Sequence, residues 1–251
     1  MNQTLPTRDG LAEAAHRFEE LEPSAVLEWA QSTYAPRLAL ACSFGGPSGM
    51  VILDMLAKGH AVDGVDASSS TRAGNTTKSR VTVYYLETDL LFPETHELIG
   101  RVEQRYGIRP VAVKPELTVP QQAEKHGAEL WKRDPDACCG MRKVEPQRAF
   151  LANFDAWITG LRRTQSSTRR VTPLVEWDEK FGLAKINPLA RWDDKQLWAY
   201  ITQHDVPYNV LNDRGYPSVG CIPCTRNIAA GEDARAGRWE GFNKTECGLH
   251  A

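Results

Sequence analysis

Short apolar runs alternate along the chain with longer segments whose apolar residues recur at helical spacing. The runs RLALACSF, VTVYYLET, RPVAVKP and AWITGL predict buried strands. The segments MVILDMLAKG, PETHELIGRVEQRYG, EPQRAFLANF and DDKQLWAYITQHD predict helices, and the first of them ends at Gly59. Strands that alternate with helices predict an α/β fold, in which helices cover both faces of a mostly parallel, twisted sheet.

The ends of the chain differ from this alternation. Residues 1–36 predict a separate helical segment that is interrupted near Pro23. Residues 63–80 are polar, small and unpatterned, so we interpret the stretch at about 65–80 as a loop or an insertion. Beyond about residue 205 the chain is rich in loop residues. The expected organisation is a helical segment (1–36), an α/β domain (37–240) and a C-terminal tail (241–251).

Composition narrows the class of protein. Of the 251 residues, 41% are hydrophobic and 25% are charged, which is typical of a soluble globular chain. A formal net charge of −2 argues against nucleic acid or a membrane surface as the partner. The N-terminus MNQTLPTRDG lacks the pattern of a signal peptide, and no apolar run is long enough to span a bilayer. We therefore expect a cytoplasmic protein.

Six cysteines in a cytoplasmic chain favour metal binding or redox chemistry over disulfides. An adjacent pair and a distant C-x-x-C can converge as four thiolates around tetrahedral zinc or an iron–sulfur cluster. Adjacent cysteines fit a cluster more easily, because each thiolate then binds its own iron. Buried, reduced cysteines without a ligand are a further reading, and the residues alone leave these alternatives open. The two pairs are Cys138 with Cys139 and Cys221 with Cys224, whereas Cys42 is expected to be a small buried residue of the first strand.

Arginines accumulate at 142–146 (RKVEP), at 160–170 (GLRRTQSSTRR) and at 231–240 (GEDARAGRWE). Such runs are commonly solvated surface, but these follow predicted strand ends or flank the cysteine pairs. Open α/β sheets bind ligands at the carboxyl ends of their strands, where several guanidinium groups suit a ligand with phosphate-like charges. The loop in ACSFGGPSG adds backbone N–H groups at a helix N-terminus, which is a second feature of anion sites.

The ordered series SFGG…GMVILDM, LFPETH, CCGMRKVEP, ITGLRRTQSSTR, NVLNDRGYPSVGCIPCTR, GEDARAGRW and ECGLH resembles a known family. These motifs are similar to those of the assimilatory adenylyl-sulfate reductases. That family is related to the phosphoadenylyl-sulfate reductases and, more distantly, to the ATP-pyrophosphatase (adenine nucleotide alpha hydrolase-like) fold. The resemblance extends from about residue 37 to the end of the chain.

The resemblance implies a thioredoxin-dependent enzyme that reduces adenosine 5′-phosphosulfate to sulfite and AMP in sulfate assimilation and cysteine biosynthesis. It implies a [4Fe–4S] cluster on Cys138, Cys139, Cys221 and Cys224, which selects a cluster over zinc. The cysteine of ECGLH, Cys247, corresponds to the catalytic nucleophile. The implied substrate-binding residues are Ser43, Gly45, Leu86, Thr88, Lys143, Gly160, Arg163, Arg169, Arg235 and Arg238.

Three features depart from the family pattern. The loop is SFGGPSG where the family more typically has SFGAED, so an acidic residue is missing. The second strand ends LETDLL instead of LDTGRL, so a Gly and an Arg are missing near Leu86 and Thr88. The polar stretch at 65–80 has no counterpart in the motifs.

The implied chemistry explains a nucleophile near the C-terminus. The thiolate of Cys247 would attack the sulfonate sulfur, expel AMP and form an enzyme S-sulfocysteine, from which a thiol of thioredoxin would release sulfite. A mobile tail would let Cys247 reach first the nucleotide and then a protein partner. We expect His250 to be a solvated or tail-anchoring residue rather than a base. Homo-oligomer formation is left open.

Rival functions remain at this stage. The nearest is reduction of phosphoadenylyl sulfate, or of both nucleotides, because the two substrates differ by one 3′-phosphate. An ATP-pyrophosphatase-type ligase or tRNA-thiolating enzyme with a structural metal predicts ATP consumption and has no role for ECGLH. A non-catalytic zinc or iron–sulfur module predicts that Cys247→Ser is without effect on activity.

Overall fold

A seven-stranded sheet forms the centre of the molecule. The structure, a computed structural model, describes residues 5–59, 62–63 and 81–250, so the predicted loop or insertion at 65–80 lies outside the described residues. The strand order is β2-β3-β1-β5-β7-β6, and β4 pairs with the second half of β3. The strands are β1 (Leu38–Ala41), β2 (Val62–Asp63), β3 (Val81–Leu86), β4 (Val111–Val113), β5 (Ala156–Ile158), β6 (Val175–Asp178) and β7 (Leu183–Ile186).

Parallel pairing prevails in this sheet, as the alternation of strands and helices predicted. All pairs are parallel except β6 with β7, which form an antiparallel hairpin at one edge. The four apolar runs contain β1, β3, β4 and β5. The hairpin was not predicted, and it adds an antiparallel edge to a parallel sheet, as many mixed sheets do.

The helices begin and end where the local sequence favours it. Proline occupies the first turn of α2, α3 and α4, where its missing N–H costs no hydrogen bond. The break near Pro23 and the end of α3 at Gly59 are confirmed. The α-helices of the described residues are α1 (Arg8–Phe18), α2 (Pro23–Tyr34), α3 (Pro47–Lys58), α4 (Pro93–Tyr106), α5 (Val119–His126), α6 (Leu130–Arg133), α7 (Pro135–Cys139), α8 (Glu145–Leu151) and α9 (Asp194–His204).

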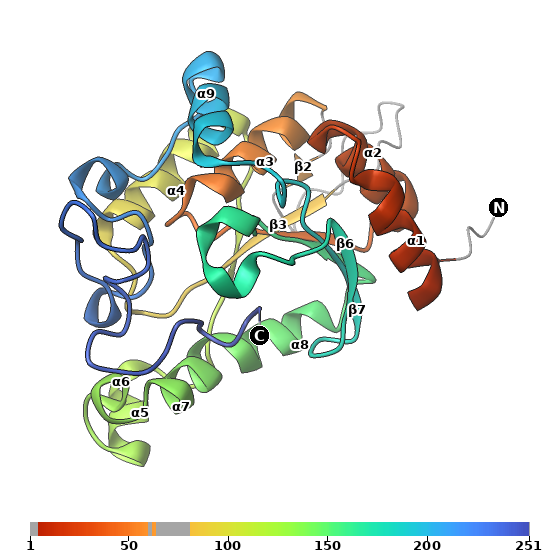
Figure 1. Ribbon diagram of the computed structural model, residues 1–251. Coiled ribbons are helices and arrows are strands. Elements are labelled where there is room, and N and C mark those ends of the chain that lie inside the picture. Colours follow the sequence, from red (N-terminus) through yellow and green to blue (C-terminus); the bar gives the residue numbers. More distant parts are fainter. Residues whose placement is uncertain (1–4, 60–61, 64–80, 251) are drawn as a thin grey trace.

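Alternate residues of the strands face two separate cores. Leu38 and Leu40 of β1 pack in the larger core, together with buried residues of α1, α2, α3, α4 and α9. Ala39 lies between them in sequence and faces the opposite side, where it packs with Trp157 and with Leu151 of α8. Helices therefore cover both faces of the sheet, and Figure 1 shows α8 on the side opposite α2 and α3.

The chain beyond α9 is mainly loop, as predicted, and covers the carboxyl ends of the central strands. Isolated bridges join Leu91 to Cys221 and Thr225 to Arg238, so this segment is fixed to the loop that follows β3. The described C-terminal residues run back past α8, as the blue trace in Figure 1 shows. None of the described helices combines the length and apolar character needed to cross a membrane.

Candidate functional site

A cavity of about 440 Å³ opens at the carboxyl ends of β1, β3 and β5. Its walls include Ser43 after β1, Leu86 and Thr88 at the end of β3, and Gly160 after β5. A volume of this size suits a small-molecule ligand. Its position agrees with the prediction that charged ligands bind at this end of the sheet.

Glycine lets the loops that form this cavity approach one another closely. A Cβ atom on Gly160 would lie 3.0 Å from the Cβ atom of Ser48 and 3.1 Å from the backbone nitrogen of Gly49, at the start of α3. A Cβ atom on Gly45 would lie 2.9 Å from the carbonyl oxygen of Val219. Gly45 therefore packs against the C-terminal segment, and it is not among the residues that line the cavity.

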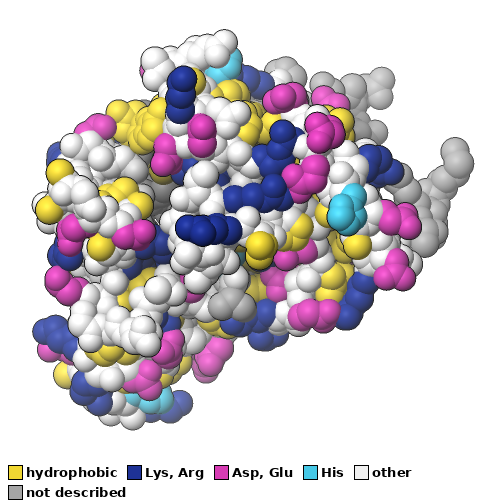
Figure 2. Space-filling view, in the orientation of Figure 1, with side chains coloured by type: hydrophobic (Ala, Val, Ile, Leu, Met, Phe, Trp, Pro, Cys, Tyr) yellow, Lys and Arg dark blue, Asp and Glu magenta, His cyan; other side chains and the backbone are white. Residues whose placement is uncertain are grey.

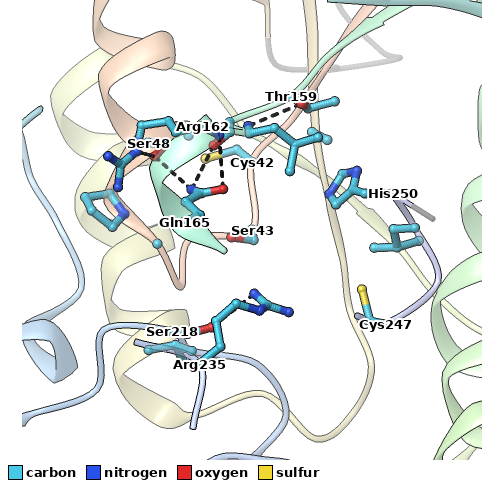
Figure 3. A pocket seen from close by; sticks show the side chains of 18 of the residues that line it. Cys42, Ser43, Ser48, Thr159, Arg162, Gln165, Ser218, Arg235, Cys247 and His250 are labelled. Carbon is cyan, nitrogen blue, oxygen red and sulfur yellow. Dashed lines mark hydrogen bonds between the residues drawn. The ribbon is translucent and has the colours of Figure 1, made fainter. Parts of the chain in front are cut away.

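Arg162 anchors the loop after β5, a role that sequence reasoning missed. Its buried guanidinium donates to Ser48 Oγ over 3.1 Å and pairs with Asp194 over 2.6 Å. Gln165 donates from Nε2 to the carbonyl oxygen of Gly160 over 3.1 Å, and both side chains appear beside Ser48 in Figure 3. The only signal in the sequence was the paired arginine in GLRRTQ, from which the second arginine was chosen.

The structure does not bring Arg163 to the cavity. Its guanidinium forms two bonds to the carboxylate of Glu19, at 2.5 Å and 3.1 Å, and donates to the carbonyl oxygen of Thr172. The hydrogen bond from Arg163 lowers the pKa of Glu19. In this structure Arg163 links the end of α1 to the loop after β5.

Four cationic side chains and one thiol also line this cavity. Figure 3 shows Cys247 and the guanidinium of Arg235 directed toward the same part of the cavity. Burial by itself lowers the pKa of Lys143, but the thiolates of Cys221 and Cys247 outweigh it, and the pKa is raised. The group consists of Lys143, Arg169, Arg235, Arg238 and Cys247, and all five line the cavity.

Trp239 and His250 also border the cavity. The Arg238 guanidinium carbon lies 4.4 Å from the centroid of the Trp239 ring, a cation–π arrangement. His250 stacks on Trp157 with ring centroids 5.6 Å apart and planes inclined by 10°. His250 thus anchors the tail, one of the two roles expected for it. Figure 2 shows Lys and Arg side chains near the middle of the face that is turned toward the viewer, with Asp and Glu side chains between them.

The four paired cysteines surround a second, smaller cavity next to Lys143. The helix α7 ends at Cys139 and continues as a π-helical segment, η1 (Gly140–Val144), a rare form that often occurs at functional sites. Burial raises the pKa of Cys138 and Cys139, and that of Cys224 to about 12. Among the described residues, no group of three or more His, Cys, Asp or Glu side chains is arranged to hold a single metal ion.

Polar side chains contact these sulfurs and tie the two pairs together. The Thr88 hydroxyl lies 3.3 Å from Cys221 Sγ, and Gln122 donates to Cys138 Sγ over 3.8 Å. The buried guanidinium of Arg142 binds both partners, donating to the carbonyl oxygen of Thr88 and to Gln122 Oε1. Arg142 also pairs with Asp89 over 2.7 Å.

This last contact accounts for one departure from the family pattern. Asp89 stands where the family has glycine and adopts a φ of 56°. Aspartate is among the few residues that occupy this left-handed region, and the pairing with Arg142 holds it there. The backbone after β3 therefore keeps a conformation that suits glycine although the glycine is absent.

Comparisons with known proteins agree with the site. The model of the phosphoadenosine phosphosulfate reductase domain matches residues 37–227. An adenosine 5′-phosphosulfate reductase of Salinibacter ruber is 45% identical over 96% of this chain and 88% of its own length. That of Halalkalibacterium halodurans is 44% identical over the full length of both chains.

The chain is also similar to solved structures. The phosphoadenylyl-sulfate reductase of Candida auris, a phosphate complex, superposes with a TM-score of 0.71 and 32% identity, over 90% of this chain and all of that one. The FMN adenylyltransferase of Candida glabrata, with a TM-score of 0.55 and 14% identity over 88% of this chain and 66% of that one, shares the fold alone. The family model matches more than half of this chain, and the curated relatives align with nearly all of it. The chain therefore belongs to the phosphoadenosine phosphosulfate reductase domain family.

Proposed function

We propose that this protein reduces adenosine 5′-phosphosulfate to sulfite and AMP, with Cys247 as the nucleophile and a thioredoxin-like dithiol as the reductant. The observation that carries the proposal is that Cys247 shares one cavity with Lys143, Arg169, Arg235 and Arg238. A thiolate that attacks an anionic sulfonate needs positive charge around the transferred group, and this cavity supplies it. The cytoplasm, where thiols stay reduced, is the location that fits this chemistry.

The reaction divides into two thiol steps. The Cys247 thiolate forms a bond to the sulfonate sulfur, the bond from that sulfur to the bridging phosphate oxygen breaks, and AMP leaves with the electron pair. A thiolate of the reductant then attacks the Cys247 sulfur, and sulfite leaves with the pair of the sulfur–sulfur bond. The second thiol of the reductant resolves the mixed disulfide, so the dithiol loses the two electrons that sulfur gains.

The four paired cysteines would be the ligands of a [4Fe–4S] cluster. They line one cavity, and polar contacts from Thr88 and Gln122 reach two of the sulfurs. Adjacent cysteines suit a group in which each sulfur binds its own iron. When bound, the cluster would supply a fixed charge beside Lys143, whereas the electrons come from thiols. Cys138, Cys139, Cys221 and Cys224 would hold it.

The unphosphorylated nucleotide is the proposed substrate because the curated relatives that span the chain are named adenosine 5′-phosphosulfate reductases. The Candida auris structure carries the name of the phosphoadenylyl-sulfate enzyme, at lower identity. A comparison of kcat/KM for the two nucleotides distinguishes them. The expected result is a higher value without the 3′-phosphate.

The test of the central step uses labelled adenosine 5′-phosphosulfate without a reductant. Mass spectrometry of the digested protein should find sulfonate on Cys247 of the wild type, and none on Cys247→Ser. Addition of thioredoxin should release sulfite and restore the free thiol. ATP consumption in the absence of any adduct would instead indicate a ligase of the ATP-pyrophosphatase type.

A further inference from the structure

The tail that carries Cys247 is held by cationic side chains on both sides of the nucleophile. Arg235 donates from Nε and Nη2 to the carbonyl oxygen of Thr245, at 3.1 Å and 2.6 Å. Lys180 contacts the carbonyl oxygen of Gly248. Cys247 therefore lies between two points at which the backbone is fixed.

Glu246, the residue directly before Cys247, supplies a further contact of the tail. Its carboxylate is almost enclosed, with the side chain 11% exposed. Arg169 donates to it from Nε over 2.8 Å and from Nη2 over 2.6 Å, which is the bidentate geometry of a strong charge-assisted pair. Arg235 adds a contact of 3.2 Å, and the Thr168 hydroxyl one of 3.4 Å.

The third nitrogen of the Arg169 guanidinium also forms a hydrogen bond within the protein. Its Nη1 donates over 2.6 Å to Oε1 of Gln165, whose Nε2 donates to the carbonyl oxygen of Gly160. A continuous path of hydrogen bonds thus runs from Glu246 to the loop after β5. With the tail docked, the fork of Arg169 is directed at Glu246, so a bound anion cannot receive the same bidentate bond.

We propose that Glu246 is a positioning residue, which places the Cys247 thiol in the cavity by pairing with Arg169 and Arg235. Arg169 then serves the attack by holding the tail, while Lys143 and Arg238, which line the same cavity and do not contact Glu246, would provide positive charge for the anion. This inference rests on the proposed function, because it assigns a role within the sulfonate transfer. If Arg169 bound the nucleotide, its loss would lower both the affinity for the nucleotide and the rate of attack. If Arg169 holds the tail, its loss lowers the rate of attack alone.

Glu246→Gln removes the charge and keeps the shape. The loss of a charge-assisted pair of this kind lowers the docked population of the tail by roughly tenfold or more. We expect the rate of Cys247 sulfonation in a single turnover to fall by about that factor, with an unchanged Kd for AMP. Hydrogen exchange of the backbone amides in 241–250 should be faster in the variant.

Glu240→Gln is the matched control, because it removes an equal charge just before the tail but breaks only an exposed contact with Arg226. It should leave the sulfonation rate, the AMP affinity and the exchange of the tail at wild-type values. A double variant of Glu246→Gln with Arg169→Gln should be no slower than the slower single variant, since both break one contact.

Three outcomes would overturn the inference: a wild-type sulfonation rate in Glu246→Gln, a parallel loss of AMP affinity, or equal effects in Glu240→Gln. The exchange measurement needs no turnover and is made on the protein without substrate. The two proposals can also fail separately. If Glu246→Gln speeds exchange of the tail but the wild type forms no adduct, the docking role of Glu246 stands and the proposed function is contradicted.

Discussion

At the residue scale, docking of the tail brings a neutral imidazole into a cationic cavity. His250 stacks on Trp157, and its Nδ1 is buried without a hydrogen-bond partner among the described residues. Burial lowers the pKa of His250 well below its usual 6.5, and the nearby charges of Lys185 and Arg169 act in the same direction. A neutral His250 adds no further positive charge to the cavity.

This shift makes docking of the tail depend on pH. An undocked His250 has a pKa near 6.5, so below that pH the undocked tail binds more protons than the docked one. Docking therefore weakens as the pH falls below about 6.5 and is insensitive to His250 above it. Hydrogen exchange of residues 241–250 at pH 5.5 and 8 should show this loss of protection, and His250→Gln should remove the dependence. A wild-type tail that is equally protected at both values would contradict the expectation.

At the element scale, the cavity depends on the close approach of α3 to the end of β5. The absence of a side chain at Gly160 permits this contact, and the hydrogen bonds of Arg162 and Gln165 to the two loops hold it in place. Ser48 and Gly49, at the start of α3, thereby line the cavity beside Gly160. Two elements that are distant in sequence therefore form one wall of the cavity.

Gly160→Ala tests this contact. The added methyl group would meet the Cβ atom of Ser48 at 3.0 Å and a backbone nitrogen at 3.1 Å, so α3 and β5 must separate. We expect a loss of about 1–3 kcal/mol in the free energy of unfolding and weaker binding of AMP, measured by urea denaturation and calorimetry.

Gly100→Ala serves as its control, because a Cβ atom there meets nothing within 4 Å and the residue lies inside α4. That change should keep AMP affinity and stabilise the protein by about 0.5–1 kcal/mol, as alanine does within helices. Equal losses in the two variants would argue against a special role for the contact at Gly160.

At the scale of the whole molecule, the proposed cluster joins two distant parts of the chain. Cys139 lies at the end of α7 and Cys221 in the segment after α9. The elements between them include α8, β5, β6, β7 and α9. Both thiols line the same small cavity. A group bound there closes a long loop and so restricts the unfolded chain.

Cys139→Ser should therefore lower both the iron content and the stability. Closing a loop of about 80 residues is worth about 4 kcal/mol by the chain-entropy argument used for disulfides, so the Tm of the variant should drop by several degrees. The measurements are iron and acid-labile sulfide per chain, and calorimetry. Cys247→Ser removes a thiol outside the four, and its iron content and Tm should match the wild type. Loss of iron from both variants, or from neither, would count against the assignment.

The sequence predicted the strand-end residues that line the cavity better than it predicted the partners of the charged side chains. Ser43, Leu86, Thr88 and Gly160 lie at or just after the ends of recognisable strands, and all four line the cavity. Arg163 and Arg162 are adjacent in one motif, and only the packing of Glu19 against one and of Asp194 against the other distinguishes them. Local pattern carries no information on which of two neighbouring arginines faces inward.

Two elements of the structure, the helix α5 and the hairpin of β6 and β7, were not predicted from the sequence. The helix α5 carried a capping box between Thr118 and Gln121, a usable signal in the sequence. The sequence signal for the hairpin of β6 and β7 was weaker. Every residue of β7 is buried, and its sequence lacks a clear alternation of apolar and polar positions. Its pairing with β5 decides its place in the sheet.

The sequence by itself determined the α/β architecture, the family and the separation of Cys247 from the two cysteine pairs. Those features depend on periodicity and on motif order, which are local properties of the chain. Only the tertiary structure decided that Arg169 faces Glu246, that Arg163 faces Glu19 and that Arg142 ties Thr88 to Gln122. The partner of a charged side chain depends on which segments the fold brings within hydrogen-bond reach, and these pairs span from 20 to 144 positions of the chain.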